Sequence, residues 1–187
     1  MTNEERQIRA VYDDKTITVY QAYNNAIAES AVKHQTFVSP PFKMDRMTWI
    51  KPSFLWMMYR SGWATKPNQE HILAIKITRE GFEWAMQNAC LSHFDPEVYE
   101  SHEAWKEQLQ ESPVRIQWDP ERDIHMNKLD YRSIQMGLSG VAVNKYVKEW
   151  IQEISDITEL VNSIKSTLEN DQKASYRLPT ERPYPFR

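Results

Sequence analysis

Apolar and polar positions alternate with a period of two in three stretches of the chain, and this pattern predicts β-strands. The stretches are residues 16–22 (TITVYQA), 71–78 (HILAIKIT) and 114–118 (VRIQW). The second is apolar at both sets of alternating positions, so we expect a central strand that is covered on both faces. Asp119 and Pro120 are expected to end the third strand. Residues 131–137 fit either a strand or a turn.

Steps of three and four residues between apolar positions predict helices elsewhere. We expect them over residues 25–35, 52–62, 80–91, 96–110 and 141–168. Asn24 or Asn25 supplies the N-cap of the first helix, and Gly62 ends the second. Residues 36–52 contain three prolines and show no clear period, which indicates a long loop.

Strands and helices follow one another without strict alternation, which predicts an α+β fold. We expect one domain over residues 1–187, built from a small mixed sheet, flanking helices and a long C-terminal helix. The prolines near the C-terminus predict an extended tail over residues 174–187.

Composition narrows the class of protein. The chain has 187 residues, of which 41% are hydrophobic and 26% are charged, enough for one domain with a sizeable core. No apolar run approaches the roughly 20 residues that span a bilayer, so we expect no membrane partner. The charged N-terminal segment and the single cysteine, Cys90, favour the reducing cytoplasm over a secreted location.

The most informative stretch for function is residues 42–66, which we call the basic-aromatic block. It carries five lysines and arginines against one acid, Asp45, within a chain of net charge −3. Its rings suit stacking on bases, and its cations suit phosphate. We assign ligand binding here to Arg46, Lys51, Ser53, Tyr59 and Arg60. The alternative is that the rings build the core while the cations extend into solvent.

Two further groups of side chains are candidates near the N-terminus. Tyr20, Gln21 and Tyr23 lie where the first predicted strand ends, a place where ligands commonly bind. We assign ring stacking to Tyr20 and a catalytic role to Gln21, whose amide both donates and accepts. Arg6 and Arg9 share one helical face and suit a phosphate clamp. The alternative for the strand end is ordinary alternation of buried and exposed residues. The alternative for the two arginines is that they are solvated surface charges.

The last candidate group follows the third predicted strand. Asp119 suits a general base or a partner for a ribose hydroxyl, and Gln135 suits substrate orientation. Arg122 and Arg132 add cations for ligand binding, although turn formation alone also explains the Asp-Pro-Glu-Arg run. The five histidines show no metal-binding spacing, so we expect no metal. Four glycines and the absence of Walker and GxGxxG motifs argue against a glycine-rich phosphate loop.

Several segments together resemble the family described as domain of unknown function 4291. They are RQIRA (6–10), VYQAY (19–23), RMTWIKPSFLWMMYRSGW (46–63), QWDPER (117–122), RSIQMGL (132–138) and RPYP (182–185). The resemblance covers nearly the whole chain but implies no activity, because the family has none that can be carried over.

At the level of the fold, the order of predicted elements is similar to that of small ADP-ribosyltransferases. That resemblance implies NAD binding, with an aromatic ring on nicotinamide and a late acid or amide that assists transfer. Gln21 stands where some of those enzymes have histidine, Arg9 is a candidate substitute, and no residue matches the late acid.

These observations lead to three hypotheses of function. The first is an enzyme or former enzyme that binds NAD or another nucleotide, resembling a transferase. The second is a non-catalytic module that binds RNA ends or another phosphorylated partner. The third is a scaffold whose tryptophans all belong to the core. The pattern does not predict an oligomeric state.

Overall fold

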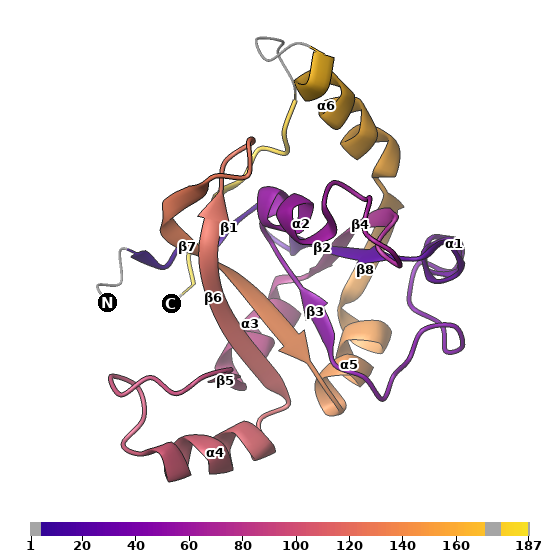
Figure 1. Cartoon of the computed structure of the whole chain (residues 1–187). Helices are drawn as coiled ribbons and strands as arrows, with labels where there is room; N and C mark the ends of the chain where they lie inside the picture. The colour runs from indigo at the N-terminus through magenta and orange to yellow at the C-terminus, as the bar shows by residue number, and fades with distance from the viewer. Residues whose placement is uncertain (1–4, 171–176, 187) are drawn as a thin grey trace.

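Helices and strands are combined in an α+β fold in the computed structural model, which describes residues 5–170 and 177–186 (Figure 1). In chain order the elements are β1 (Arg9–Ala10), β2 (Thr16–Tyr23), α1 (Asn25–His34), β3 (Thr48–Ile50), α2 (Phe54–Ser61), β4 (His71–Thr78), α3 (Arg79–Gln87), β5 (Ala89–Leu91), α4 (His102–Glu111), β6 (Val114–Arg122), β7 (Lys128–Leu138), α5 (Val141–Lys145), the π-helical turn η2 (Tyr146–Trp150), β8 (Ile151–Asp156), α6 (Thr158–Asn170) and β9 (Arg182–Pro183).

The first sheet has the order β2-β4-β8 and is antiparallel. On one face of β4, Leu73, Ile75 and Ile77 are fully buried in the main core with residues of α1 and α3. On its other face, Ile72 packs in a second cluster with residues of α2 and α6. Helices therefore cover both faces of β4, and the prediction of a central strand is confirmed.

The second sheet has the order β3-β7-β6-β5, and its long strands β6 and β7 curve through the middle of the molecule (Figure 1). Gln117 of β6 stands directly opposite Gln135 of β7. An isolated bridge joins this sheet to β2, because the backbones of Tyr20 and Lys51 exchange hydrogen bonds of 2.7 and 3.3 Å. The two sheets therefore meet at the point where β3 ends.

Two sequence predictions about strands need correction, and the structure decides one that was left open. The loop predicted over residues 36–52 contains β3, which pairs with the end of β7. The strand predicted to stop before Asp119 continues to Arg122. Pro120 has no N–H group to donate to the neighbouring strand, and a shift of register between Pro120 and Arg122 lets the pairing with β7 continue. Residues 131–137, which fitted either a strand or a turn, lie within β7. In each case pairing with a distant strand decides the structure.

Two of the predicted helices are shorter than expected. The helix predicted over residues 80–91 ends at Gln87, and residues 89–91 form β5. The helix predicted over residues 96–110 begins only after Ser101, whose side chain caps it. Local capping groups define the ends of both helices more sharply than the spacing of apolar residues does.

The long C-terminal helix predicted over residues 141–168 is wrong, because this stretch is divided among α5, η2, β8 and α6. Ile154 lies in β8 opposite Ile75 and is buried in the core. The Gln35 side chain exchanges hydrogen bonds of 2.9 Å with the Ile154 backbone. The three- and four-residue spacing fitted a helix, but the open edge of β4 and the β-branched residues favour a strand.

The extended end of the chain lies beside its beginning. Arg9 and Ala10 of β1 pair with Pro183 and Arg182 of β9, which places the two ends of the fold on one side (Figure 1). Tyr184 is buried under this strand pair. Residues 174–176 of the predicted tail lie outside the described residues.

Candidate functional site

A cavity of about 840 Å³ opens where the two sheets meet, between the end of β2, β3, α2 and the middle of β6 and β7. We call it the basic pocket. Its lining consists of Gln21, Ala22, Tyr23, Asn24, Ile27, Pro41, Phe42, Lys43, Arg46, Met47, Thr48, Trp49, Lys51, Met57, Arg60, Asn68, Gln69, Gln117 and Gln135. Four lining residues are cationic and six carry side-chain amides, whereas none is acidic. This composition favours a ligand that carries negative charge together with hydrogen-bonding groups.

Three of the four cations are available to a ligand. Lys43, Arg46 and Arg60 are exposed, and within residues 5–170 and 177–186 none of their side chains has a protein hydrogen-bond or ion-pair partner. Arg60 lies in the last turn of α2, and Lys43 and Arg46 lie in the loop before β3. The positive charge of these groups is therefore not neutralised by neighbouring carboxylates.

The fourth cation, Lys51, is different because it is 5% exposed. Its backbone is held by Tyr20, and its Nζ donates one long hydrogen bond, 3.5 Å, to the carbonyl oxygen of Trp49. Burial, together with the smaller effect of the nearby Arg60 charge, lowers the pKa of this amine to about 7, although Asp119 acts in the opposite direction. A buried lysine with a strongly lowered pKa on the wall of a cavity is a feature of functional sites.

The side-chain amides of Gln117 and Gln135 also line the pocket. The Asp119 carboxylate accepts hydrogen bonds from Gln117 Nε2 at 3.0 Å and from Gln135 Nε2 at 2.7 Å. Because a carboxylate can only accept, both amides must turn their nitrogen toward Asp119. Their carbonyl oxygens have no hydrogen-bond partner among the residues described, so they are left to accept from a ligand.

The amide of Gln21 is held by protein groups on every side. Its Nε2 donates to Tyr23 Oη, Thr48 Oγ1 and the Trp49 carbonyl oxygen, at 3.0, 2.6 and 3.1 Å. Its Oε1 accepts from the buried Tyr146 hydroxyl at 2.7 Å. Burial raises the pKa of Tyr23 to about 12, so this hydroxyl stays protonated. The network fixes the pocket wall where β2 meets β3.

Comparison with protein families decides the classification of the chain. A family model described as domain of unknown function (DUF4291) matches residues 7–184. The chain belongs to the DUF4291 family. No curated protein matches it.

The fold brings several of the predicted site residues of this DUF4291 protein together. Gln21, Tyr23, Arg46, Lys51, Arg60 and Gln135 all line the basic pocket. Asp119 lies directly behind two lining residues, to which it is hydrogen-bonded. Residues that are as far apart in sequence as Gln21 and Gln135 thus share one cavity, as the sequence hypothesis of nucleotide binding requires.

Three other predicted ligand-binding residues belong to the packing around α2. Tyr20 is buried in the second cluster, with its ring edge-on to Phe54 at 5.6 Å. Ser53 is buried and caps α2 by accepting from the N–H group of Trp56. Tyr59 is partly exposed and stacks on Trp56. None of these three side chains is part of the pocket lining.

The remaining predicted cations have protein partners outside the pocket. The guanidinium of Arg122 lies 3.8 Å from the centre of the Tyr59 ring. Arg6 pairs with Asp95 at 3.1 Å, whereas Arg9 and Arg132 donate to backbone carbonyl oxygens of the tail and of β6. These arginines tie separate elements together and do not share a cavity with Lys51.

Several residues of the pocket lining were not among the predicted site residues. Gln117 alternates with the buried Ile116 in β6, and this alternation was the signal that it faces away from the core. Asn24 was interpreted only as a helix cap, a role that it fulfils by accepting from Ile27. Asn68 and Gln69 lie in a loop before β4 and carry no local signal of function.

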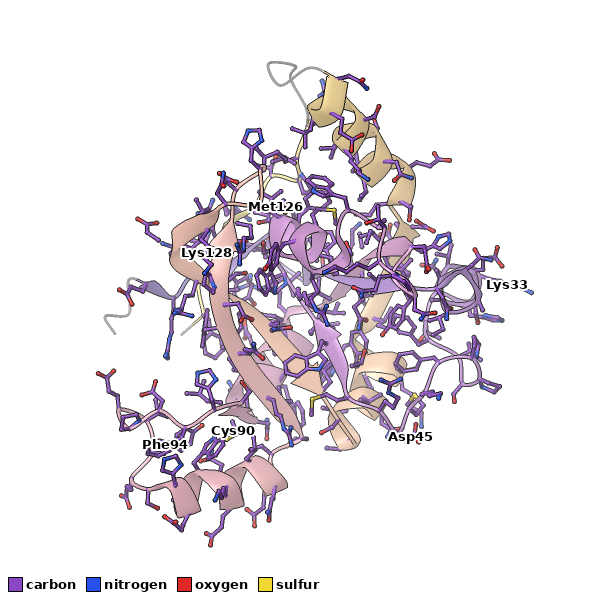
Figure 2. The ribbon with its side chains drawn as sticks, in the orientation of Figure 1. Lys33, Asp45, Cys90, Phe94, Met126 and Lys128 are labelled. Carbon is purple, nitrogen blue, oxygen red and sulfur yellow. The ribbon has the colours of Figure 1, made fainter. Side chains whose placement is uncertain are left out.

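Other chemistry is not supported within the described part of the chain. The single cysteine, Cys90, is buried, and its thiol contacts the Tyr99 hydroxyl at 3.2 Å. It lies near Phe94 and α4, far from Lys33 on α1 (Figure 2). Among the described residues, no group of three or more His, Cys, Asp or Glu side chains is arranged to hold a metal ion. None of the described helices is long and apolar enough to cross a membrane.

Proposed function

We propose that this protein binds a nucleotide in the basic pocket. The observation that carries the proposal is the pairing of three unneutralised cations with two amide oxygens oriented by Asp119, all around one cavity without an acidic lining residue. Phosphate groups are bound by lysine and arginine, and ribose hydroxyls or exocyclic amines donate to amide oxygens. The cavity volume also lies in the range of small-molecule sites.

NAD and other dinucleotides are candidate ligands, since their charged and hydroxyl-bearing parts suit the two walls of the pocket. The rings of Phe42 and Trp49 at the lining offer apolar contact to a base. Transfer of an ADP-ribosyl group was the reaction considered from the sequence. Gln21, Asp119 and Gln135 are all held in hydrogen bonds to protein groups, which suits positioning of the wall better than proton transfer.

Isothermal titration with ATP, AMP, NAD, ADP-ribose and adenosine tests the proposal. We expect affinity to rise with the number of phosphates and to be lowest for adenosine. Arg46→Gln and Arg60→Gln should each weaken ATP binding about tenfold, the size expected when a hydrogen-bonded charge is removed. Lys33→Gln, which alters an exposed cation on α1 outside the pocket (Figure 2), should leave the affinity unchanged.

Two results would overturn the proposal. One is the absence of heat with every nucleotide at millimolar concentration. The other is binding that Arg46→Gln and Arg60→Gln weaken no more than Lys33→Gln does, since the ligand would then sit elsewhere on the molecule.

A further inference from the structure

The amine of Lys51 is buried in the wall of the basic pocket without the partners that an ammonium group requires. An ammonium carries three N–H donors. Among the described residues, the one acceptor within hydrogen-bonding distance of Nζ is the Trp49 carbonyl oxygen, at the long distance of 3.5 Å. No described carboxylate lies within ion-pair distance of Nζ. The site therefore holds a neutral amine more easily than a charged one.

The charges that face Lys51 act in opposite directions. Arg60 of α2 disfavours the ammonium form, and Asp119 of β6 favours it. Burial adds the larger effect, and the pKa falls to about 7. A large fraction of the amine is then unprotonated near neutral pH, with its lone pair free to attack an electrophile.

We propose that Lys51 is a nucleophile that forms an imine with the carbonyl carbon of a phosphorylated aldehyde or ketone bound in the basic pocket. The amine nitrogen attacks the carbonyl carbon to give a carbinolamine. The two amine hydrogens then leave with the carbonyl oxygen as one molecule of water, and a carbon–nitrogen double bond remains. The step needs no oxidant, reductant or metal.

The surroundings of Lys51 define the class of substrate. The exposed Lys43, Arg46 and Arg60 around the same cavity suit the phosphate group. The carbonyl oxygens of Gln117 and Gln135 suit hydroxyl groups. A sugar phosphate in its open-chain form carries all three features, and so does the terminal ribose of ADP-ribose, whose anomeric carbon is not bonded to a base. The inference thus rests on the proposed anion binding and adds a reaction to it.

Pyridoxal 5′-phosphate is a suitable probe, because it combines an aldehyde, a phosphate and an aromatic ring. The protein is incubated with it at pH 7, reduced with borohydride, digested and analysed by mass spectrometry. We expect one predominant adduct at Lys51, formed at least about tenfold faster than at any exposed lysine, whose ordinary pKa leaves little free amine. Pyridoxal without phosphate should react more slowly.

The pH profile and matched variants complete the test. Labelling of Lys51 should reach half its maximal rate near pH 7, whereas labelling of exposed lysines should still increase at pH 9. Lys51→Met, which keeps an unbranched side chain, should abolish the predominant adduct, and Lys33→Arg should not. An adduct spread over Lys43, Lys33 and other lysines of the wild-type protein, with no preference for Lys51, overturns the inference.

Competition with ATP separates this inference from the proposed nucleotide binding. If ATP binds in the titration and protects Lys51 from labelling, both proposals are supported. If Lys51 is labelled selectively but no nucleotide binds, the reactive lysine is supported and the nucleotide is excluded. If ATP binds but labelling is unselective, the reactive lysine alone is excluded.

Discussion

Asp119 illustrates how one residue can set the character of a whole pocket wall. Its carboxylate fixes the amides of Gln117 and Gln135, so that both present acceptors to the cavity. It is also the charge that raises the pKa of Lys51 against the effect of burial. Neither function requires Asp119 to touch a ligand, although the sequence first suggested it as a catalytic base.

Asp119→Asn should therefore weaken ATP binding about tenfold. Gln117 and Gln135 donate to different oxygens of Asp119, and in asparagine one of these oxygens is replaced by an NH2 donor, so one glutamine must turn its nitrogen toward the pocket. The free energy of unfolding should fall by about 1–3 kcal/mol, because charge-assisted hydrogen bonds are lost. Titration calorimetry and urea denaturation measure the two effects. Asp14→Asn, at an exposed aspartate, is the control. Equal affinities of the two variants would contradict this role of Asp119.

At the scale of elements, the structure separates local signals from pairing between distant segments. Asn24 and Gly62 cap α1 and α2, as their residue types indicated in the sequence, whereas Ser53 caps the start of a helix that was predicted to begin at Pro52. The strands β3 and β8 were missed because their pairing with β7 and β4 depends on residues far away. Spacing alone cannot distinguish a short strand from part of a helix in such segments.

The same distinction applies to the candidate site. The cations of the basic pocket were predictable because they are concentrated in the block from 42 to 66. Strand alternation placed Gln117 on the face away from the core, whereas Gln135 was singled out as a polar residue within an apolar stretch. The sequence did not show that Tyr20 and Ser53 are packed inside, since a strand end and a helix start look alike whether they are covered or open. The hydrogen bond from the Tyr146 hydroxyl to Gln21 Oε1 was not predictable either, because it joins residues 125 positions apart that only the folded chain brings together.

A contact between the tail and α2 gives a prediction about pH. Glu181 Oε1 accepts from the N–H group of Phe54, the first residue of α2, at 2.7 Å. The pKa of this carboxyl is raised to about 8, mainly by burial and to a smaller extent by Glu121, although the Phe54 hydrogen bond and Arg9 act in the opposite direction. Between pH 4.5, the ordinary pKa of this carboxyl, and about pH 8, Glu181 keeps its proton in the folded protein but has lost it in the unfolded chain. Stability contributed by Glu181 is thus full below pH 4.5 and is lost as the pH rises toward 8.

Glu181→Gln keeps an acceptor for Phe54 but removes this titration. We expect the wild-type free energy of unfolding to fall relative to that of the variant between pH 5 and 8. The slope should be below the full value of about 1.4 kcal/mol per pH unit, since Glu181 retains some exposure to solvent. Urea denaturation across this range measures the difference. Parallel stability curves for the two proteins would show that the carboxyl group does not titrate as described.

Gly137 of β7 gives a prediction about the pocket wall. A Cβ atom at this position would lie 2.6 Å from Met47 Sδ and 2.9 Å from Trp49 Cζ2, and both side chains line the basic pocket. Gly137→Ala should therefore displace the Trp49 ring, weaken ATP binding and destabilise the fold by about 1–3 kcal/mol.

Gly140→Ala is the matched control for that variant. Gly140 has a φ of +50° and no atom within 4 Å of a Cβ position, so alanine there strains the backbone without a clash. Its thermal midpoint should fall while its affinity for ATP stays at the wild-type value. If the two variants bind ATP equally well, close packing of Trp49 on Gly137 does not shape the site.

At the scale of the whole molecule, charge is distributed unevenly. The chain carries a net charge of −3, yet four cations and no acidic residue line one cavity between two sheets. Such an arrangement attracts a small anion to one place, while the net negative charge of the chain disfavours a long polyanion. It favours a nucleotide over an extended nucleic acid, which was the alternative partner suggested by the sequence.

Salt dependence distinguishes the two partners. Lys43, Arg46 and Arg60 can neutralise at most three phosphates of an oligonucleotide. A plot of the logarithm of the association constant against the logarithm of the salt concentration should therefore have a slope no steeper than about −2. Affinity should not increase when a 5′-phosphorylated strand is lengthened from two nucleotides to about ten, because the further phosphates lie beyond the cations of the pocket and the chain has a net charge of −3. Fluorescence anisotropy at several salt concentrations measures both quantities. A slope that steepens with length, together with rising affinity, would instead identify a cationic path that continues outside the pocket and would make RNA the better candidate.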